Sequence, residues 1–323
     1  MQVTGGNTME IVILDGHALN HGDLSWKCFE QFGTVRYFDR TEGESETIER
    51  IGNAEIIILN KVNITDSILE ACPSIKLICI LATGYNVVDC EAAAKRGIPV
   101  CNAPGYGTDS VAQFTFALLL ELCHHVSIHS DSVHSGEWSS CSDFCYWKTP
   151  QMELAGKTMG IIGYGAIGQA VGRIAKAFGL NVLACNRTRR TGDEYVSLDE
   201  LLEKSDIISL HCPLFPENKG IINAETINKM KDGVILLNTA RGGLLDEKDV
   251  ANALSTKKIR CAAVDVVSSE PISRENPLLT APNCIITPHM AWAPIEARQR
   301  ILDIAVNSIH GFINGDKINV VNM

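Results

Sequence analysis

The sequence lacks a long hydrophobic run, an excess of basic residues and any Cys-x-x-Cys pair. Its longest apolar stretch, Phe114–Leu122, is interrupted by Thr115 and Glu121 and falls short of the ~20 residues that a membrane-spanning helix needs. The formal net charge of -10 disfavours nucleic acid and anionic membranes as partners. These absences predict an acidic globular protein whose partner is a small molecule.

Cysteines are numerous but dispersed. Most of the 12 lie in apolar segments such as Leu77–Leu81 and Arg260–Val264, which favours buried thiols in a reducing cytoplasm. Cys141 and Cys145 are open to a second interpretation, as a redox pair or half of a metal site. Unpaired loop thiols fit their spacing better, and we expect a cytoplasmic protein without a bound metal.

The first residues, Met1–Asn7, lack the basic and apolar regions of a secretory signal. One interpretation makes Met9 the natural start, with Met1–Thr8 as a disordered leader. A chain of 323 residues is long enough for about two domains.

The stretch Met159–Gly168 predicts a strand, a glycine turn and the start of a helix. In this G-x-G-x-x-G pattern the first glycine permits a tight turn, the second lets backbone approach a pyrophosphate, and the third lets the helix pack on the strand. The helix N-terminus offers free N–H groups to phosphates. We therefore predict a dinucleotide site whose first contacts are Gly163, Tyr164, Gly165, Ala166, Ile167 and Gly168.

The residues after the next predicted strand, Asn181–Cys185, bear on the choice of cofactor. An NAD site places Asp or Glu there to bind the ribose 2′-hydroxyl, but this sequence has Asn186, followed by Arg187, Thr188, Arg189 and Arg190. A guanidinium without a carboxylate suits a 2′-phosphate. The sequence favours NADP(H) over NAD(H), while arginines that point into solvent would leave NAD(H) permitted.

Strands alternate with amphipathic helices along the whole chain, which predicts an α/β protein with two doubly wound parallel sheets. A Rossmann nucleotide-binding domain, residues 104–293, would be inserted in a flavodoxin-like substrate domain, residues 9–103 plus 294–323. The expected strands are Ile11–Leu14, Val35–Phe38, Ile56–Leu59, Leu77–Leu81, Pro99–Cys101, Ile207–His211, Val234–Asn238, Ile259–Asp265 and Cys284–Thr287. The expected helices are Asp23–Phe32, Glu44–Ile51, Thr65–Ala71, Asp89–Arg96, Asp109–His125, Gln169–Phe178, Leu198–Lys204, Glu247–Leu254 and Ile295–Phe312.

Ligands of open α/β sheets bind beyond the carboxyl ends of the strands, so the polar residues at those ends are candidates. Three catalytic candidates stand there: Arg241 as a cationic clamp for a carboxylate, and Glu270 and His289 as an acid–base pair. A carboxylate bonded to one imidazole nitrogen favours the protonated ring, a competent acid near neutral pH. Each also has a plain alternative: Arg241 could form a surface ion pair, Glu270 could be a solvated charge in a loop, and His289 could be a core histidine.

Two other stretches have a functional and a plain interpretation. Gly84, in the turn Ala82–Asn86, would let backbone N–H groups face an anion, although an ordinary turn fits as well. His125 and His129 would share a helical face and invite a metal hypothesis, but a solvated helix end suits them better.

Four motifs in order resemble the D-2-hydroxyacid dehydrogenases, and the resemblance covers essentially the whole chain. They are Gly163–Gly168, Asn238–Gly243, Asp265-Val266 with Glu270-Pro271, and Thr287–His289. The resemblance implies hydride transfer between a nicotinamide and a small D-2-hydroxy acid or 2-oxo acid. Arg241 would bind the substrate carboxylate and carbonyl, Glu270 would support His289, and His289 would carry the proton.

The resemblance also implies roles for other positions. Thr83 and the Gly84 backbone would hold the carboxylate beside Trp292, Thr108 would approach the cofactor phosphates, and Asp265 the nicotinamide. Further cofactor contacts would be His211, Cys212, Pro213, Thr239, Ala240 and Ala291. The helix Asp109–His125 and the loop after it would form a homodimer contact.

Within the family, His289–Ala293 and Asp143–Trp147 are most similar to enzymes of D-glycerate and hydroxypyruvate, with glyoxylate as another substrate. Gln113 stands where members usually carry Glu, and Asn186 where NAD-dependent members carry Asp, which bears on cofactor preference. Two alternatives stay open: a dehydrogenase of another acid such as D-lactate, and a non-catalytic, nucleotide-sensing protein of the corepressor type.

Overall fold

The computed structural model describes residues 9–188, 192 and 194–323. The expected leader Met1–Thr8 and the two arginines Arg189 and Arg190 lie outside this part. The chain divides into two compact units: one extends up to Tyr106 and includes Ala293–Met323, and the other is Gly107–Trp292. The assignment of substrate to one domain and cofactor to the other stays a prediction.

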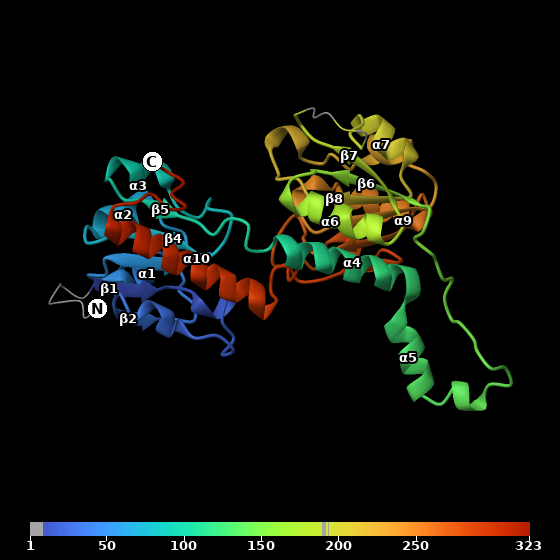
Figure 1. Ribbon diagram of the computed structural model, residues 1–323, viewed down its shortest axis with the longest axis horizontal. Coiled ribbons are helices and arrows are strands. Elements are labelled where there is room, and N and C mark those ends of the chain that lie inside the picture. Colours follow the sequence, from blue (N-terminus) through green and yellow to red (C-terminus); the bar gives the residue numbers. More distant parts are fainter. Residues whose placement is uncertain (1–8, 189–191, 193) are drawn as a thin grey trace. The chain divides into compact units, whose positions relative to one another are not determined.

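A five-stranded parallel sheet forms the centre of the first unit, in the order β2-β1-β3-β4-β5 (Figure 1). Every residue of β3 and β4 is buried and apolar, as expected for strands covered on both faces. This order is that of flavodoxin-like folds. The strands are β1 Met9–Ile13, β2 Gly33–Tyr37, β3 Ile56–Leu59, β4 Leu77–Ile80 and β5 Val100–Cys101.

The helices of this unit are α1 Glu44–Ile51, α2 Asp66–Ala71, α3 Cys90–Lys95 and α10 Ile295–Asn314. The side chains of Thr65 and Asp89 cap α2 and α3 by accepting backbone N–H bonds. Helix α10 returns from the far end of the sequence and contacts β4. Its Arg298 is buried and binds both carboxylate oxygens of Asp23, which lowers the pKa of that carboxyl to about 2.

The expected helix Asp23–Phe32 was wrong. Only Trp26–Phe29 is helical, as one 3₁₀ segment. The Asn20 side-chain oxygen accepts the N–H groups of Gly22 and Leu24 and so holds this stretch in a turn. Local side-chain bonds of this kind compete with a helix, although the apolar spacing favoured one.

A six-stranded parallel sheet forms the centre of the second unit, in the order β11-β10-β9-β8-β6-β7. Tyr195 adds a single parallel bridge to Ala184 of β7, at the place where a Rossmann sheet has its third strand. The strands are β6 Thr158–Ile162, β7 Asn181–Cys185, β8 Ile207–Leu210, β9 Val234–Asn238, β10 Ile259–Val264 and β11 Cys284–Ile286.

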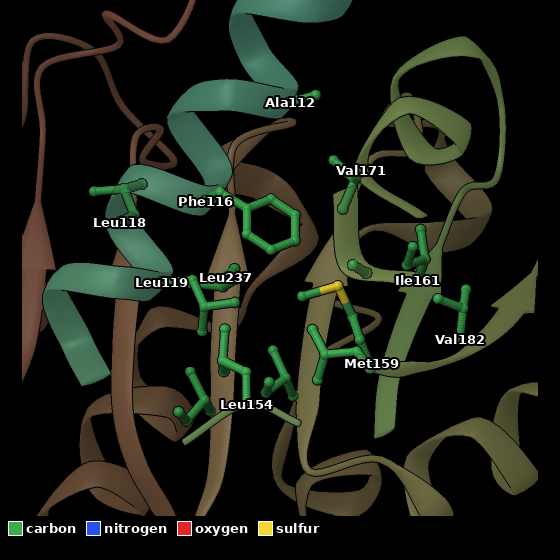
Figure 2. Packing of buried hydrophobic residues seen from close by; sticks show 14 of the residues in the cluster. Ala112, Phe116, Leu118, Leu119, Leu154, Met159, Ile161, Val171, Val182 and Leu237 are labelled. Carbon is green, nitrogen blue, oxygen red and sulfur yellow. The ribbon is translucent and has the colours of Figure 1, made fainter. Parts of the chain in front are cut away.

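Helices cover both faces of this sheet, so the predicted fold class is confirmed. Residues of α4 and α6 pack on one face, and residues of α7, α8 and α9 on the other. Figure 2 shows Phe116 and Leu119 of α4 packed in one cluster with Met159 of β6 and Leu237 of β9. The helices are α4 Thr108–His124, α5 Val126–His134, α6 Ala166–Ala177, α7 Leu198–Lys204, α8 Ala224–Lys229 and α9 Glu247–Ser255.

The segment after α4 is a further helix, α5, and not the loop that the sequence analysis expected. His125 has a φ of 45°, which ends α4 and begins α5 in a new direction. Helix α5 and the chain up to Gln151 project from the second unit, and we call this segment the arm (Figure 1). No single helix of the described chain has the length and apolarity to span a membrane; α4 with α5, bent by 57°, passes as a pair by length and composition alone.

Candidate active site

The glycine turn after β6 is built on close backbone contacts. Gly163 has a φ of 96°, and a Cβ there would lie 2.4 Å from the backbone nitrogen of Cys212. A Cβ on Gly168 would lie 2.3 Å from the Gly163 carbonyl oxygen. At Gly165, by contrast, a Cβ would meet nothing within 4 Å. The outer surface of the turn is therefore open at the N-terminus of α6, which is the shape that a pyrophosphate requires.

Asn186 follows β7 and is tied to this turn. Its Oδ1 accepts the backbone N–H of Tyr164 at 2.7 Å. The Tyr164 ring packs edge-to-face on Tyr195, the residue of the isolated bridge. An amide at position 186 thus uses its oxygen to hold the glycine turn, which leaves an uncharged side chain where NAD sites present a carboxylate.

Arg187 lies beside Asn186, at the same end of the sheet. Its guanidinium carbon is 4.6 Å from the centre of the Phe215 ring, within the range of a cation–π contact. Both Arg187 and Thr188 are exposed. The stacked guanidinium can still bond an anion through its edge, because the ring occupies only its face.

His289 and Glu270 form a hydrogen-bonded pair. The His289 Nδ1 lies 2.7 Å from Glu270 Oε2, and the side chains are 37% and 39% exposed. The pair is therefore accessible to a ligand, and its second imidazole nitrogen can face one. Glu270 Oε1 also accepts the N–H of Val267 at 3.3 Å, which orients the carboxylate.

The backbone at His289 adopts a φ of 52°, in the left-handed region that few non-glycine residues occupy. Buried Asp265 holds it there: its carbonyl accepts the His289 N–H, and its carboxylate accepts the N–H groups of Met290 and Ala291 and the Thr287 hydroxyl. The Trp292 indole then donates to the His289 carbonyl at 2.8 Å. Asp265 thus anchors the turn that presents the imidazole.

Arg241 follows β9 and is exposed, with its Nη1 on the Ala240 carbonyl at 2.7 Å. A Cβ on Gly242 would lie 1.9 Å from the carbonyl carbon of Val267. Because position 242 carries no side chain, the Arg241 loop lies directly on the loop that carries Glu270. The structure thus brings the loops of all three catalytic candidates to the same edge of one sheet.

His211 and Cys212 follow β8 and face the glycine turn. The His211 Nε2 bonds the Ser209 hydroxyl at 2.7 Å, and burial lowers the pKa of the imidazole to about 3. Its Nδ1 is buried without a hydrogen-bond partner in the described part of the chain. Burial also raises the pKa of Cys212, and the Asn218 amide, held by the Pro213 carbonyl, contacts its sulfur.

In the first unit, the predicted substrate residues follow β4. The Thr83 hydroxyl donates to the Ala103 carbonyl at 2.9 Å, and the Thr83 carbonyl accepts the Asn102 amide at 2.7 Å. A Cβ on Gly84 would contact only Asn86 Oδ1, at 3.6 Å. The turn is fixed by its neighbours, and its backbone at Gly84 is open to an anion.

Comparisons with known proteins agree with this geometry. The NAD-binding domain of D-isomer specific 2-hydroxyacid dehydrogenases matches residues 116–291. A hydroxypyruvate reductase of Blautia hydrogenotrophica is 54% identical over 97% of this chain and 100% of its own. A glycerate dehydrogenase of Methylorubrum extorquens is 39% identical over 97% and 99%. An NADPH-dependent glyoxylate/hydroxypyruvate reductase of Sinorhizobium meliloti has a TM-score of 0.82 at 25% identity over 97% of each chain.

The chain belongs to the D-isomer specific 2-hydroxyacid dehydrogenases. It is an oxidoreductase that acts on a CH–OH group and transfers a hydride between a nicotinamide cofactor and a small 2-hydroxy acid. The residues of the second unit fit such a cofactor: the glycine turn is open at Gly165, and the polar groups of Asn186 and Arg187 lie at the end of the neighbouring strand.

Several features of this dehydrogenase site escaped the sequence analysis. Ser209 pairs with His211 because alternate residues of a strand share a face, a signal that was present in the sequence. Phe215 beneath Arg187 gave no such signal, since the two residues belong to different loops. Of the two histidines considered for a metal, His129 makes hydrogen bonds with both ring nitrogens: its Nδ1 bonds the His125 carbonyl, and its Nε2 accepts the N–H of Lys148. Within residues 9–188, 192 and 194–323, no three potential metal ligands cluster.

Proposed function

We propose that this dehydrogenase reduces hydroxypyruvate to D-glycerate and catalyses the reverse oxidation, with glyoxylate as a second substrate. The hydrogen-bonded pair of His289 and Glu270 is the observation that carries the proposal, because it supplies an oriented acid–base group. The relatives named hydroxypyruvate reductase and glycerate dehydrogenase support this choice of acid.

In the proposed reduction, protonated His289 donates its proton to the alkoxide oxygen that forms on the substrate. Glu270 holds the ring through Nδ1, so the other imidazole nitrogen is the one that faces the substrate. Arg241 binds the carboxylate and stabilises the developing negative charge. A bound nicotinamide supplies the hydride. In the oxidation, neutral His289 accepts the hydroxyl proton. Thr83, the Gly84 backbone and Trp292 are further proposed contacts of the substrate.

NADP(H) is the proposed cofactor. Asn186 brings no charge that would repel a 2′-phosphate, and the Arg187 guanidinium is pre-oriented by Phe215. The NADPH-dependent structural relative supports this preference. Beyond the glycine turn, Thr108, His211, Cys212, Pro213, Thr239 and Ala240 are proposed contacts, together with Asp265, His289 and Ala291.

We also propose a cytoplasmic homodimer assembled through the arm. Val126, Trp138, Phe144 and Trp147 are 64%, 49%, 89% and 70% exposed, which is unusual for large apolar side chains that stay in water. They line the arm together with a groove of about 610 Å³ between α5 and Trp147. A second copy of the chain would cover both.

Initial rates with a panel of small 2-oxo acids test this function. Hydroxypyruvate, glyoxylate, pyruvate and phosphorylated hydroxypyruvate are each offered with NADPH and with NADH. We expect the highest kcat/KM for hydroxypyruvate with NADPH. A preference for pyruvate would assign the chain to the D-lactate type, and nucleotide binding without turnover would support a sensing protein.

A further inference from the structure

The loop that carries Glu270 is held from outside the active site by Glu247, the first residue of α9. Glu247 Oε1 accepts the N–H of Ser268 at 2.7 Å, and Oε2 accepts the Ser268 hydroxyl at 2.7 Å. Oε2 also accepts the side-chain amide of Asn276 at 3.0 Å. Asn276 is buried, and its own oxygen caps the following 3₁₀ segment through the N–H of Leu278. A carboxylate is required here, because all its partners are donors.

The peptide between Val267 and Ser268 joins this anchor to the catalytic candidates. Its N–H is the group that Glu247 accepts. Its carbonyl carbon and oxygen would lie 1.9 and 2.1 Å from a Cβ on Gly242, so the peptide lies directly on the Arg241 loop. The preceding N–H, that of Val267, bonds Glu270 Oε1. A shift of this one peptide would move the Glu270 carboxylate relative to both His289 and Arg241.

We propose that Glu247 is a positioning residue for the acid–base pair: through Ser268 it fixes the peptide that sets the distance between Glu270 and His289. This inference rests on the proposed function of that pair. Glu247 needs no contact with substrate or cofactor to act in this way. It is one more residue on which the reaction depends, and it lies on a different element from Arg241, Glu270 and His289.

The variant Glu247→Gln tests this role with minimal change of shape. A glutamine keeps one acceptor oxygen. If that oxygen takes the place of Oε2, it can accept from the Ser268 hydroxyl and the Asn276 amide, but the NH₂ group then faces the Ser268 N–H, which is also a donor. In the opposite orientation the NH₂ group faces the Asn276 amide, whose oxygen is already engaged by Leu278. We therefore expect the Val267–Ser268 peptide to lose part of its support while α9 stays folded.

Asp249→Asn is the matched control. Asp249 lies in the same first turn of α9, but its carboxylate accepts the N–H of Ala224, away from the Glu270 loop. Both variants remove one negative charge from the helix N-terminus, so any effect of the helix dipole is common to them.

We expect Glu247→Gln to lower kcat for hydroxypyruvate reduction by roughly 10-fold to 100-fold, the scale of a misplaced catalytic group. KM and the Kd for NADPH should stay within about two-fold of the wild-type values, because Glu247 contacts neither the substrate nor the cofactor in the proposed role. Asp249→Asn should keep the wild-type kcat. In a His289→Ala background, Glu247→Gln should cause no further loss, because the two changes disable one unit.

The possible failures give different results. Wild-type protein without turnover on the acid panel would remove the proposed function itself. Active wild-type protein with equal kcat in Glu247→Gln and Asp249→Asn would overturn the positioning role alone, as would a further loss in the His289→Ala background. If Glu247→Gln fails to fold, Glu247→Asp decides: it keeps the charge but shortens the side chain by one methylene, so the carboxylate is drawn back from the Ser268 N–H, and a kcat equal to wild type would overturn the inference.

Discussion

The imidazole of His289 is fixed at two levels. Its Nδ1 is bonded to Glu270, and its backbone is held in the left-handed region by Asp265. An acid–base group needs both, because proton transfer depends on the placement of the ring and on which nitrogen carries the proton. Arg241 is less restrained and is exposed, as suits a group that closes on an anion.

Replacing His289 by Ala should lower the rate of hydroxypyruvate reduction by roughly 10²- to 10⁴-fold, the usual contribution of a positioned acid–base group. Steady-state kinetics would measure the loss, and circular dichroism would verify folding. Glu270→Gln keeps the shape of the side chain, and its rate should lie between those of the wild type and of His289→Ala. Near-normal turnover of the Ala variant would remove His289 from the mechanism.

Arg187→Ala should weaken NADPH binding by about 10-fold or more, because a hydrogen bond to a charged group is worth about 1.5–3 kcal/mol. NADH, which lacks the 2′-phosphate, should bind almost unchanged. Fluorescence titration of both nucleotides measures the difference. Arg274→Ala, another exposed arginine of the second unit, serves as the control. Equal weakening of NADPH and NADH would contradict the phosphate contact.

At the scale of elements, the strands and most helices could be predicted from the sequence. Strands β3, β7 and β9 have the expected ends, because continuous apolar runs stop at polar turn residues. The same rule placed Arg241 and His289 at one sheet edge. Failures came where local chemistry or exposure overrides the pattern. Hydrogen bonds to the Asn20 side chain hold a turn before Trp26, where a longer helix was expected. Helix α5 presents its apolar residues to solvent.

The exposed aromatic side chains of the arm form the proposed dimer interface. The double change Phe144→Ser with Trp147→Ser should weaken the homodimer by at least about 10-fold, because aromatic side chains dominate the energy of interfaces. Sedimentation equilibrium would show the shift towards monomer. The control is Tyr37→Ser in the first unit, where the aromatic ring is 60% exposed. An unchanged dimer constant, or a greater effect at Tyr37, would move the interface elsewhere.

For the molecule as a whole, stability against acid depends on buried titratable groups. His211 is neutral in the folded state, because burial lowers its pKa from 6.5 to about 3. The unfolded chain binds a proton at this residue as the pH falls below about 6.5, whereas the folded chain does so only near pH 3. The contribution of neutral His211 is therefore fully present above pH 6.5 and is lost as the pH falls towards 3.

Between pH 7 and pH 5 this linkage should cost the second unit about 2 kcal/mol of unfolding free energy, at roughly 1.4 kcal/mol per pH unit below 6.5. His211→Gln, which cannot titrate, should show a correspondingly flatter pH dependence, even if it is less stable at pH 7. Urea unfolding at several pH values measures this slope. His134→Gln, at an exposed histidine, should keep the wild-type slope. An unchanged slope in His211→Gln would show that the imidazole is hydrated.

The division of the chain also has a consequence for enzyme design. The residues proposed for proton transfer and cofactor choice belong to Gly107–Trp292, whereas Thr83 and Gly84 belong to the other unit. Under that proposal, the turn after β4 can change how the acid is held without altering the reactive groups. Grafting that turn from a relative should therefore change the KM for the acid while the reaction itself is retained.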